Sequence, residues 1–168
     1  MRLIKIVVIS IFLGFLVRAF LFEGIYVASG SMEPTLFKGK YYILQRVSYY
    51  FNQPQRGDIV AFPSPVKNGK DLIKRIIALP NEELQIKYKI VFINGSPLRE
   101  NYVKYTRENE LLKGDNLGPL IVPQGKVFVM GDNRDESFDS RDWDDPVTKE
   151  KIYFVDIKDI EGKITLFY

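Results

Sequence analysis

Apolar positions form one long run at the start of the chain, followed by many short runs. The long run covers residues 3–22, and its only charged residues, Lys5 and Arg18, lie near its ends. A helix of these 20 residues would span about 30 Å at about 1.5 Å per residue, which matches the hydrocarbon core of a bilayer. Long cationic side chains near the ends of such a helix can reach the interface. The pattern therefore predicts a transmembrane helix.

A cleavable signal peptide is the alternative interpretation of the same run. Arg2 and Lys5 would form its basic start, and residues 28–30 would supply its small-residue cleavage site. Arg18 favours a retained anchor, because signal peptides rarely place arginine between the apolar core and the cleavage site. The basic start indicates a cytoplasmic N-terminus. We therefore expect a single-pass protein of the cytoplasmic membrane, anchored by residues 1–22, with its other residues on the outer face.

The rest of the chain, residues 23–168, contains short apolar runs that are rich in Ile, Val, Phe and Tyr and bounded by Gly, Pro, Asn or Asp. Such runs are typical of β-strands joined by turns and not of amphipathic helices. Asn94-Gly95 follows one of them and is a strong signal for a tight hairpin. The runs are 41–44, 59–62, 76–79, 90–93, 127–130, 152–155 and 164–167. A mainly β domain is therefore expected.

Two polar stretches interrupt this pattern. Residues 100–119 have little periodicity and predict a surface excursion from the β core. Residues 132–145 carry seven acidic residues and two arginines, which by composition alone indicates a solvated loop. A calcium-binding EF-hand loop that starts at Asp135 is a weak alternative, because Ser140 stands where the sharp turn of that loop needs Gly.

The composition restricts the chemistry that the chain can perform. Basic residues number 24 and acidic residues 21, so the small positive excess does not indicate a nucleic-acid partner. The chain has no Cys and no His, which excludes thiolate nucleophiles, Ser-His-Asp triads and the common zinc sites. No metal and no other cofactor is expected. Covalent catalysis would have to use Ser, Thr, Lys, Tyr or a carboxylate.

Ser31 is the hydroxyl residue in the most unusual setting. Gly30 permits a sharp bend before it, and Pro34 stiffens the backbone after it. The small residues that precede it leave room for a substrate, and its closeness to the predicted anchor places it near a membrane surface. Ser31 is therefore a candidate nucleophile, and an ordinary turn between a helix and a strand is the alternative.

A serine nucleophile needs a base, and in a chain without His the plausible base is a neutral lysine. Free lysine has a pKa of about 10.4, so burial must lower this pKa before the amine is neutral near pH 7–8. Lys74 has the most aliphatic neighbours of any lysine, in residues 72–79. Strand alternation points Arg75 to the opposite face. Lys74 is the candidate base, unless it faces water from a half-buried strand.

Taken together, these motifs resemble the type I signal peptidases, which are membrane-anchored proteases with a Ser/Lys dyad. Four blocks match in order, and the apolar start of the chain is a fifth shared feature. The blocks are SGSMEPTL at 29–36, RGDIVAF at 56–62, KR at 74–75 with LP at 79–80, and GDNRDESFDSR at 131–141. Ala78, Asn81 and Glu136 depart from the usual family pattern, and none of them bears a proposed catalytic atom.

The resemblance implies an endopeptidase that removes N-terminal signal peptides from exported preproteins after small residues at positions −3 and −1. Ser31 would be the acylating nucleophile, and Lys74 would be the general base for acylation and deacylation. The Ser29 hydroxyl and the Ser31 backbone N–H would form the oxyanion hole. The expected partners are secretory preproteins and membrane phospholipid, with no nucleic acid and no metal.

The resemblance also implies supporting residues and a fold. Ser137 would hydrogen-bond Lys74 and orient it, and an ion pair between Asp139 and Arg141 would fix the loop beside the site. The expected fold is mainly β, with an antiparallel coiled β-sheet catalytic domain, a short inserted β segment at about 81–122 and the N-terminal transmembrane helix. An extended substrate would add a strand to a sheet edge. The residues expected to line its pockets are Ile25, Tyr26, Val27 and Ala28.

Two further readings of the function stay open at this point. The first is a specialised relative, either a mitochondrial inner-membrane peptidase or a conjugation-type processing peptidase, which the matching blocks do not separate from a general signal peptidase. The second is a non-catalytic, membrane-tethered β domain that binds peptides or ions through its acidic loop. Hydrolysis that depends on Ser31 would exclude the second reading.

Overall fold

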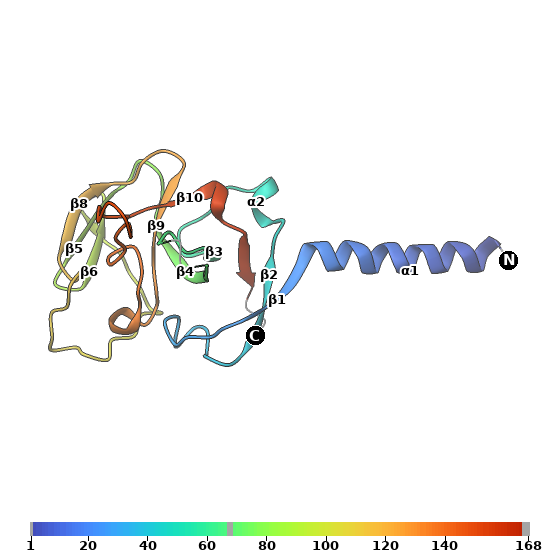
Figure 1. Ribbon diagram of the computed structural model, residues 1–168, viewed down its shortest axis with the longest axis horizontal. Helices are drawn as coiled ribbons and strands as arrows, with labels where there is room; N and C mark the ends of the chain where they lie inside the picture. The colour runs from blue at the N-terminus through green and yellow to red at the C-terminus, as the bar shows by residue number, and fades with distance from the viewer. Residues whose placement is uncertain (1, 67–68, 166–168) are drawn as a thin grey trace.

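The N-terminal run forms a helix that projects from a β domain (Figure 1). The computed structural model describes residues 2–66 and 69–165. Helix α1 (Arg2–Leu21) confirms the predicted helix, although Phe22 already belongs to strand β1, where it pairs with Gln45. In the part of the chain that the structure describes, no helix combines the length and the apolar content needed to cross a membrane.

The domain is built around a curled antiparallel sheet of seven strands. Their order is β1-β2-β11-β3-β4-β9-β10, so strands far apart in the chain lie next to each other. The strands are β1 (Phe22–Tyr26), β2 (Tyr41–Gln45), β3 (Ile59–Pro63), β4 (Asp71–Ala78), β9 (Lys126–Met130), β10 (Val155–Asp156) and β11 (Gly162–Thr165). Three short helices join them: α2 (Ser48–Phe51), η1 (Arg134–Glu136) and η2 (Ile157–Asp159). The mainly β prediction is confirmed.

A smaller sheet lies at the end of the domain that is remote from α1 (Figure 1). Its order is β7-β6-β5-β8, with β5 (Glu83–Lys87), β6 (Ile90–Ile93), β7 (Ser96–Pro97) and β8 (Leu117–Ile121). The predicted hairpin at Asn94-Gly95 is present, and both residues have positive φ, of 50° and 77°. The surface excursion predicted for residues 100–119 ends earlier than expected, because its last residues, from Leu117 on, form the start of β8 and pair with β5.

The predicted strand runs match the sheet with two exceptions. Run 76–79 covers only the second half of β4, which begins at Asp71 and pairs with β3 over its more polar first half. Run 152–155 contributes only Val155 to a strand. The last two positions of run 164–167 lie outside the described residues.

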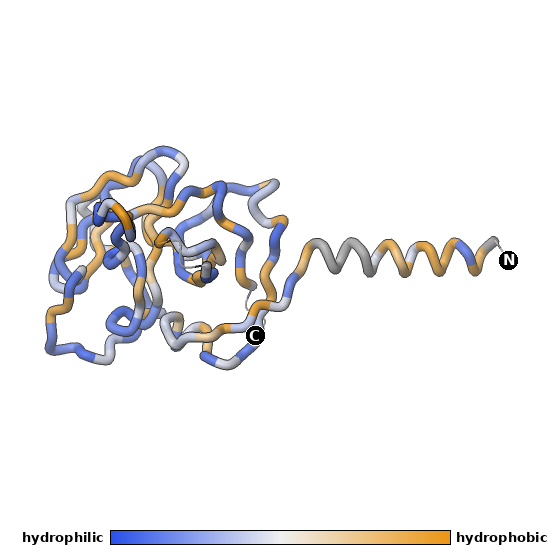
Figure 2. Tube along the Cα trace, in the orientation of Figure 1, coloured by the Kyte–Doolittle hydropathy of each residue, from blue (hydrophilic) through white to orange (hydrophobic). Residues whose placement is uncertain are grey.

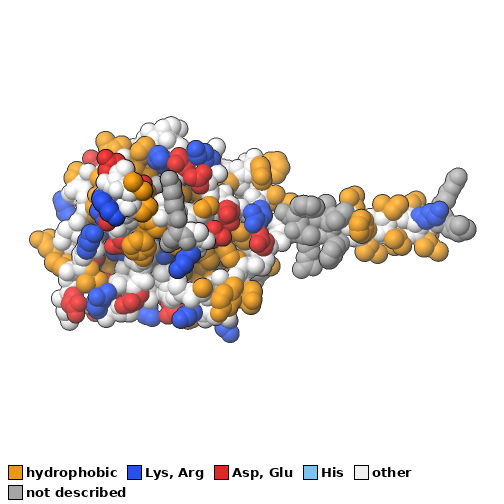
Figure 3. Space-filling view, viewed as in Figure 1, with side chains coloured by type: hydrophobic (Ala, Val, Ile, Leu, Met, Phe, Trp, Pro, Cys, Tyr) orange, Lys and Arg blue, Asp and Glu red, His pale blue; other side chains and the backbone are white. Residues whose placement is uncertain are grey.

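The apolar core fixes the segments that carry the candidate site. One cluster packs Met32 and Leu36, from the segment after β1, against Leu44 of β2 and Ala61 of β3. Two further clusters join the small sheet to β4 and β9 and fill the other side of the large sheet. The hydropathy colouring shows hydrophobic residues in the strands of the domain and along the coloured part of α1 (Figure 2). Lys, Arg, Asp and Glu are interspersed over the domain face that Figure 3 shows.

Candidate active site

Ser31 lies in a tight turn between β1 and β2. Backbone hydrogen bonds from the Glu33 N–H to Gly30 O (3.1 Å) and from the Leu36 N–H to Met32 O (2.9 Å) coil this segment. Met32 and Leu36 are buried in the core, and this packing fixes the turn against the sheet. Ser31 itself is only 8% exposed. Its hydroxyl therefore has a defined position, as a nucleophile requires.

Lys74 lies at the centre of β4 and meets Ser31. It stands opposite Val60 of β3, is 3% exposed, and donates a hydrogen bond of 2.8 Å from its Nζ to Ser31 Oγ. The alternative that Lys74 faces water is wrong, because Arg75 on the opposite face is buried as well and both faces of β4 are covered here. The two candidate reacting atoms are thus in direct contact across 43 positions of sequence.

The surroundings of Lys74 favour its neutral form. Burial lowers the pKa of its amine to about 8, against an ordinary value of 10.5. Asp139 opposes this shift, Arg141 adds to it, and Asp132 and Asp142 oppose it more weakly. The loss of hydration therefore outweighs the nearby carboxylates. A substantial fraction of the amine is neutral in mildly alkaline solution and can accept the proton of the Ser31 hydroxyl.

Ser29 lies beside the nucleophile on the solvent side. Its Oγ is 3.3 Å from Ser31 Oγ, and the residue is exposed. A substrate carbonyl placed against Ser31 would approach from this side. The position of Ser29 is thus compatible with donation to the oxygen of that carbonyl.

Ser137 does not make the predicted hydrogen bond to Lys74. Its Oγ is buried and has no hydrogen-bond partner among the described residues. The hydroxyl is turned toward Gly131, where an added Cβ would lie 2.2 Å from Ser137 Oγ and 2.5 Å from Ser31 O. Ser137 therefore packs behind the turn that carries Ser31, while the Lys74 amine is directed at Ser31 Oγ.

The expected ion pair between Asp139 and Arg141 is present and bidentate. Arg141 Nε donates to Asp139 Oδ1 at 2.9 Å, and its second guanidinium nitrogen donates to Oδ2 at 3.0 Å. Oδ2 also accepts the Gly131 N–H at 3.0 Å. Burial alone would raise the pKa of Asp139, but the charge and hydrogen bonds of Arg141, together with the Lys74 charge, hold it below its usual range.

The acidic segment is therefore not the solvated loop that its composition indicated. Several of its charged side chains are buried against cations, because the loop of residues 131–141 folds back onto β9 and the nucleophile turn. Residues 2–66 and 69–165 contain no group of three or more Asp or Glu side chains arranged to hold a metal ion, so no EF-hand arrangement is present there.

Two contacts at the site could not be found from the sequence. Arg75 donates to both carboxylate oxygens of Asp132, at 2.8 and 2.6 Å. Asn133 donates its backbone N–H to Ser31 O at 3.0 Å and its Nδ2 to Gly30 O at 3.1 Å. The Arg75 bonds join the 131–141 loop to β4, and the Asn133 bonds join it to the turn that carries Ser31. Alternation did place Arg75 opposite Lys74, but Asp132 and Asn133 belong to the loop after β9, which only the sheet order brings next to β4.

Two of the four residues predicted to line the substrate pockets, Ile25 and Tyr26, lie on β1, which among the described strands pairs with β2 alone and so forms an edge of the sheet. The strand ends at Tyr26, so Val27 and Ala28 follow it and do not belong to it. Tyr26 and Ala28 are exposed and Ile25 is half-buried. Val27 is only 4% exposed and packs in the core. Its side chain is the least available of the four to a substrate, because the turn before Ser31 rotates it inward.

Comparison with known proteins places this geometry in a family. The family model described as "Signal peptidase, peptidase S26" matches residues 1–168. The chain belongs to this family. Its members are serine endopeptidases, so the protein is a hydrolase of that class.

Individual relatives agree with this assignment. Signal peptidase I P of Bacillus subtilis subsp. natto is 40% identical over 156 residues, which cover 88% of this chain and 81% of the relative. Probable signal peptidase I-1 of Synechocystis is 39% identical over 147 residues, covering 83% and 72%. The crystal structure of a signal peptidase I from Enterococcus faecalis is similar with a TM-score of 0.51 and 35% identity, over 68% of this chain and 98% of that one.

Proposed function

We propose that the protein removes signal peptides from exported preproteins by acyl-enzyme catalysis, with Ser31 as nucleophile and Lys74 as general base. Membership of the signal peptidase family supports the removal of signal peptides. The hydrogen bond of 2.8 Å between the buried Lys74 amine and Ser31 Oγ is the observation that carries the mechanism.

In this mechanism the neutral Lys74 amine takes the proton of the Ser31 hydroxyl as Oγ attacks the carbonyl carbon of the scissile bond. The carbonyl oxygen becomes negative and is stabilised by the Ser29 hydroxyl and the Ser31 N–H. The Lys74 ammonium then gives its proton to the leaving amine, which releases the mature protein. Lys74, neutral again, activates a water that hydrolyses the ester and frees Ser31 and the signal peptide.

The substrate would bind as an extended strand against the free edge of β1. An exposed edge offers backbone N–H and C=O groups to an incoming strand, and alternate side chains of that strand then enter pockets. We expect Ile25→Ala to change the choice of cleavage site, because Ile25 is the half-buried side chain at this edge. Sequencing the products from a preprotein with two adjacent small-residue sites checks this, with Ile90→Ala on the remote small sheet as control. Unchanged site choice would contradict the pocket assignment.

The proposal includes an anchor. Residues 1–22 would cross the cytoplasmic membrane once with the N-terminus in the cytoplasm, and residues 23–168 would lie on the outer face, with residues 81–122 as the inserted β segment. Apolar side chains along α1 support this, since the large apolar side chains between Leu3 and Leu13 are 50–75% exposed. An anchor next to Ser31 would keep the site close to substrates whose apolar segment lies in the bilayer and to phospholipid headgroups.

The pH dependence of cleavage tests the proposed base. Lys74 must lose its proton to act, and burial sets its pKa at about 8, so kcat/KM should rise about tenfold between pH 7 and 9 and then level off. The measurement is cleavage of a radiolabelled preprotein by the purified, detergent-solubilised protein in buffers of constant ionic strength. Recovery of activity on return to pH 8 controls for unfolding. A profile that is flat, or that falls over this range, would contradict Lys74 as the base.

A further inference from the structure

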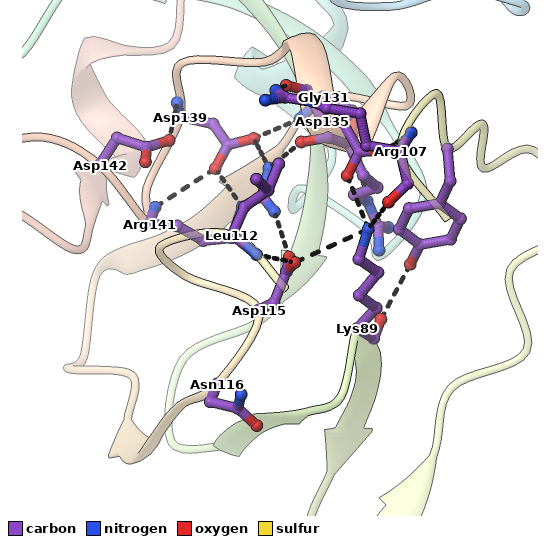
Figure 4. Close-up of polar contacts among 12 residues, drawn as sticks. Lys89, Arg107, Leu112, Asp115, Asn116, Gly131, Asp135, Asp139, Arg141 and Asp142 are labelled. Carbon is purple, nitrogen blue, oxygen red and sulfur yellow. Dashed lines mark hydrogen bonds and ion pairs between the residues drawn. The ribbon is translucent and has the colours of Figure 1, made fainter. Parts of the chain in front are cut away.

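A cluster of charged side chains fills the space between the small sheet and the 131–141 loop (Figure 4). Lys89, in the turn between β5 and β6, points into this cluster. Its Nζ lies 3.1 Å from Asp135 Oδ1 and 3.8 Å from Asp115 Oδ2, and donates to Arg107 O at 2.6 Å. The Lys89 side chain is only 10% exposed. The Lys89 amine thus joins two residues of the inserted segment, Arg107 and Asp115, to Asp135 of the 131–141 loop.

The backbone around Lys89 presents the amine in a fixed direction. Tyr88 and Lys89 both have positive φ, of 49° and 70°, as the two central residues of a tight hairpin turn. The Tyr105 hydroxyl donates to Lys89 O at 2.8 Å, and the Lys89 amine lies 5.0 Å from the centre of the Tyr105 ring. Lys89 is therefore held at both its backbone and its amine.

The first connection from Lys89 to the active site runs through Asp135. This carboxylate belongs to helix η1 of the 131–141 loop and also accepts the backbone N–H groups of Thr106 (2.8 Å) and Arg107 (2.7 Å). Burial alone would raise the pKa of Asp135, but these N–H groups and Lys89 together hold it below its usual range. Asp135 is thus ionised and joins the loop to the small sheet.

The second connection runs through Asp115 and ends at the nucleophile turn. Asp115 Oδ1 lies 3.7 Å from Arg141, which holds Asp139 in the bidentate pair. Asp139 accepts the Gly131 N–H, and Gly131 packs directly behind the Ser31 carbonyl. Each step is a contact between buried groups, so an unbroken series of contacts joins Lys89 to the Ser31 carbonyl.

The balance of charge makes Lys89 indispensable to this arrangement. The side chains of Asp115, Asp135 and Asp139 are 0–2% exposed. Lys89 contacts two of these three carboxylates, and Arg141 contacts Asp115 and Asp139. Without Lys89, Asp135 would keep only hydrogen bonds from backbone N–H groups, and Asp115 would keep the Leu112 N–H at 2.7 Å and a single cation, Arg141, at 3.7 Å. A buried carboxylate that loses its cation is strongly unfavourable, so the loop would shift toward water.

We propose that Lys89 is a positioning residue for catalysis, which holds the 131–141 loop against the Ser31–Lys74 pair. Lys89 lies outside the matching blocks, in a turn of the small sheet, whereas Lys74 lies on the large sheet and Ser31 in the turn between β1 and β2. Through Lys89, the inserted β segment contributes to catalysis and is more than a structural addition to the domain. The inference rests on the proposed function, since it concerns the same Ser31 and Lys74 chemistry.

The test compares Lys89→Met with the wild-type protein in the preprotein assay. We expect kcat to fall by about 10- to 100-fold with KM within about twofold, because misplacement of reacting groups acts on the chemical step. The alkaline midpoint of the pH profile should also move upward, because a loosened loop admits water to Lys74, whose charged neighbours are Asp139, Arg141, Asp132 and Asp142. Lys89→Arg should retain most activity. Lys87→Met, an exposed lysine of β5, is the matched control.

A double variant separates positioning from stability. Adding Asp115→Asn to Lys89→Met removes one of the two carboxylates that contact the missing amine, while the amide oxygen can still accept the Leu112 N–H. We expect its thermal unfolding midpoint to return toward the wild-type value while kcat stays low. Wild-type kcat and pH midpoint in the folded fraction of either variant would overturn the inference. Absence of preprotein cleavage by the wild-type protein would instead overturn the proposed function.

Discussion

Ser31→Ala and Lys74→Met should each reduce the rate of preprotein cleavage by about 10⁴-fold or more, because the proposed mechanism uses the two residues as one reacting unit. Removal of the nucleophile or its base leaves only substrate binding and the oxyanion donors. A 10⁴-fold loss corresponds to about 5.4 kcal/mol of transition-state stabilisation. Lys74→Arg should be equally inactive, since a guanidinium is not deprotonated near neutral pH. The measurement is single-turnover cleavage with excess enzyme.

Matched variants show whether this loss of cleavage arises in the reaction step or from a loss of folding. Ser96→Ala changes an exposed serine in β7 of the small sheet and should keep wild-type activity. Lys74→Met replaces a buried amine with an apolar side chain of similar length, so its thermal unfolding midpoint should equal or exceed that of the wild type. Residual cleavage above a hundredth of the wild-type rate in Ser31→Ala would rule out Ser31 as the nucleophile. The same residual rate in Lys74→Met would rule out Lys74 as its base.

Gly131→Ala should reduce cleavage by about 100-fold or more although it alters no reacting atom. The added Cβ would lie 2.5 Å from Ser31 O and 2.2 Å from Ser137 Oγ, which is closer than real contacts permit. Rotation of the Ser137 hydroxyl would still leave Ser137 Cβ 2.6 Å from the added Cβ, and the Ser31 carbonyl belongs to the nucleophile turn and must move with its residue. A displacement of about 1 Å at a reacting group can cost about 100-fold in rate. Steady-state kinetics should place the loss in kcat.

Gly162→Ala provides a control with similar crowding elsewhere in the sheet. There the added Cβ would lie 2.5 Å from Gln45 O, in the contact between β11 and β2. This variant should lower the unfolding midpoint while the folded fraction keeps its kcat, since neither Ser31 nor Lys74 is displaced. If Gly131→Ala behaves like Gly162→Ala, crowding behind Ser31 has no special effect on catalysis.

The outcome for Ser137 illustrates why roles inferred from a matching block need the local geometry. The resemblance assigned Ser137 a hydrogen bond to Lys74, whereas its buried hydroxyl faces Gly131 and has no partner among the described residues. The neighbouring prediction for Asp139 and Arg141 is confirmed as a bidentate pair. Residues two positions apart can bond each other through local backbone geometry, but a bond to a distant strand depends on how the loop settles on it.

The sequence by itself determined which residue types are available for catalysis and which segments form a helix or strands. The absence of Cys and His restricted covalent catalysis to Ser, Thr, Lys, Tyr or a carboxylate, and the length of the apolar runs distinguished α1 from the strands. Such features depend on residue type and near neighbours, which the chain states directly. Strand alternation also placed Lys74 and Arg75 on opposite faces of β4, but it could not say that both faces are buried.

Only the tertiary structure decided which distant groups meet. The contact of Lys74 with Ser31, the pairing of Arg75 with Asp132 and the burial of the acidic loop all depend on the order of strands in the sheet. The place of Lys89 depends on a second sheet that folds onto this loop. Hydrogen bonds and desolvation act over a few ångströms in space, whereas the sequence records distance only along the chain. The pKa of Lys74 is lowered by groups that are close in space, and the sequence therefore does not determine it.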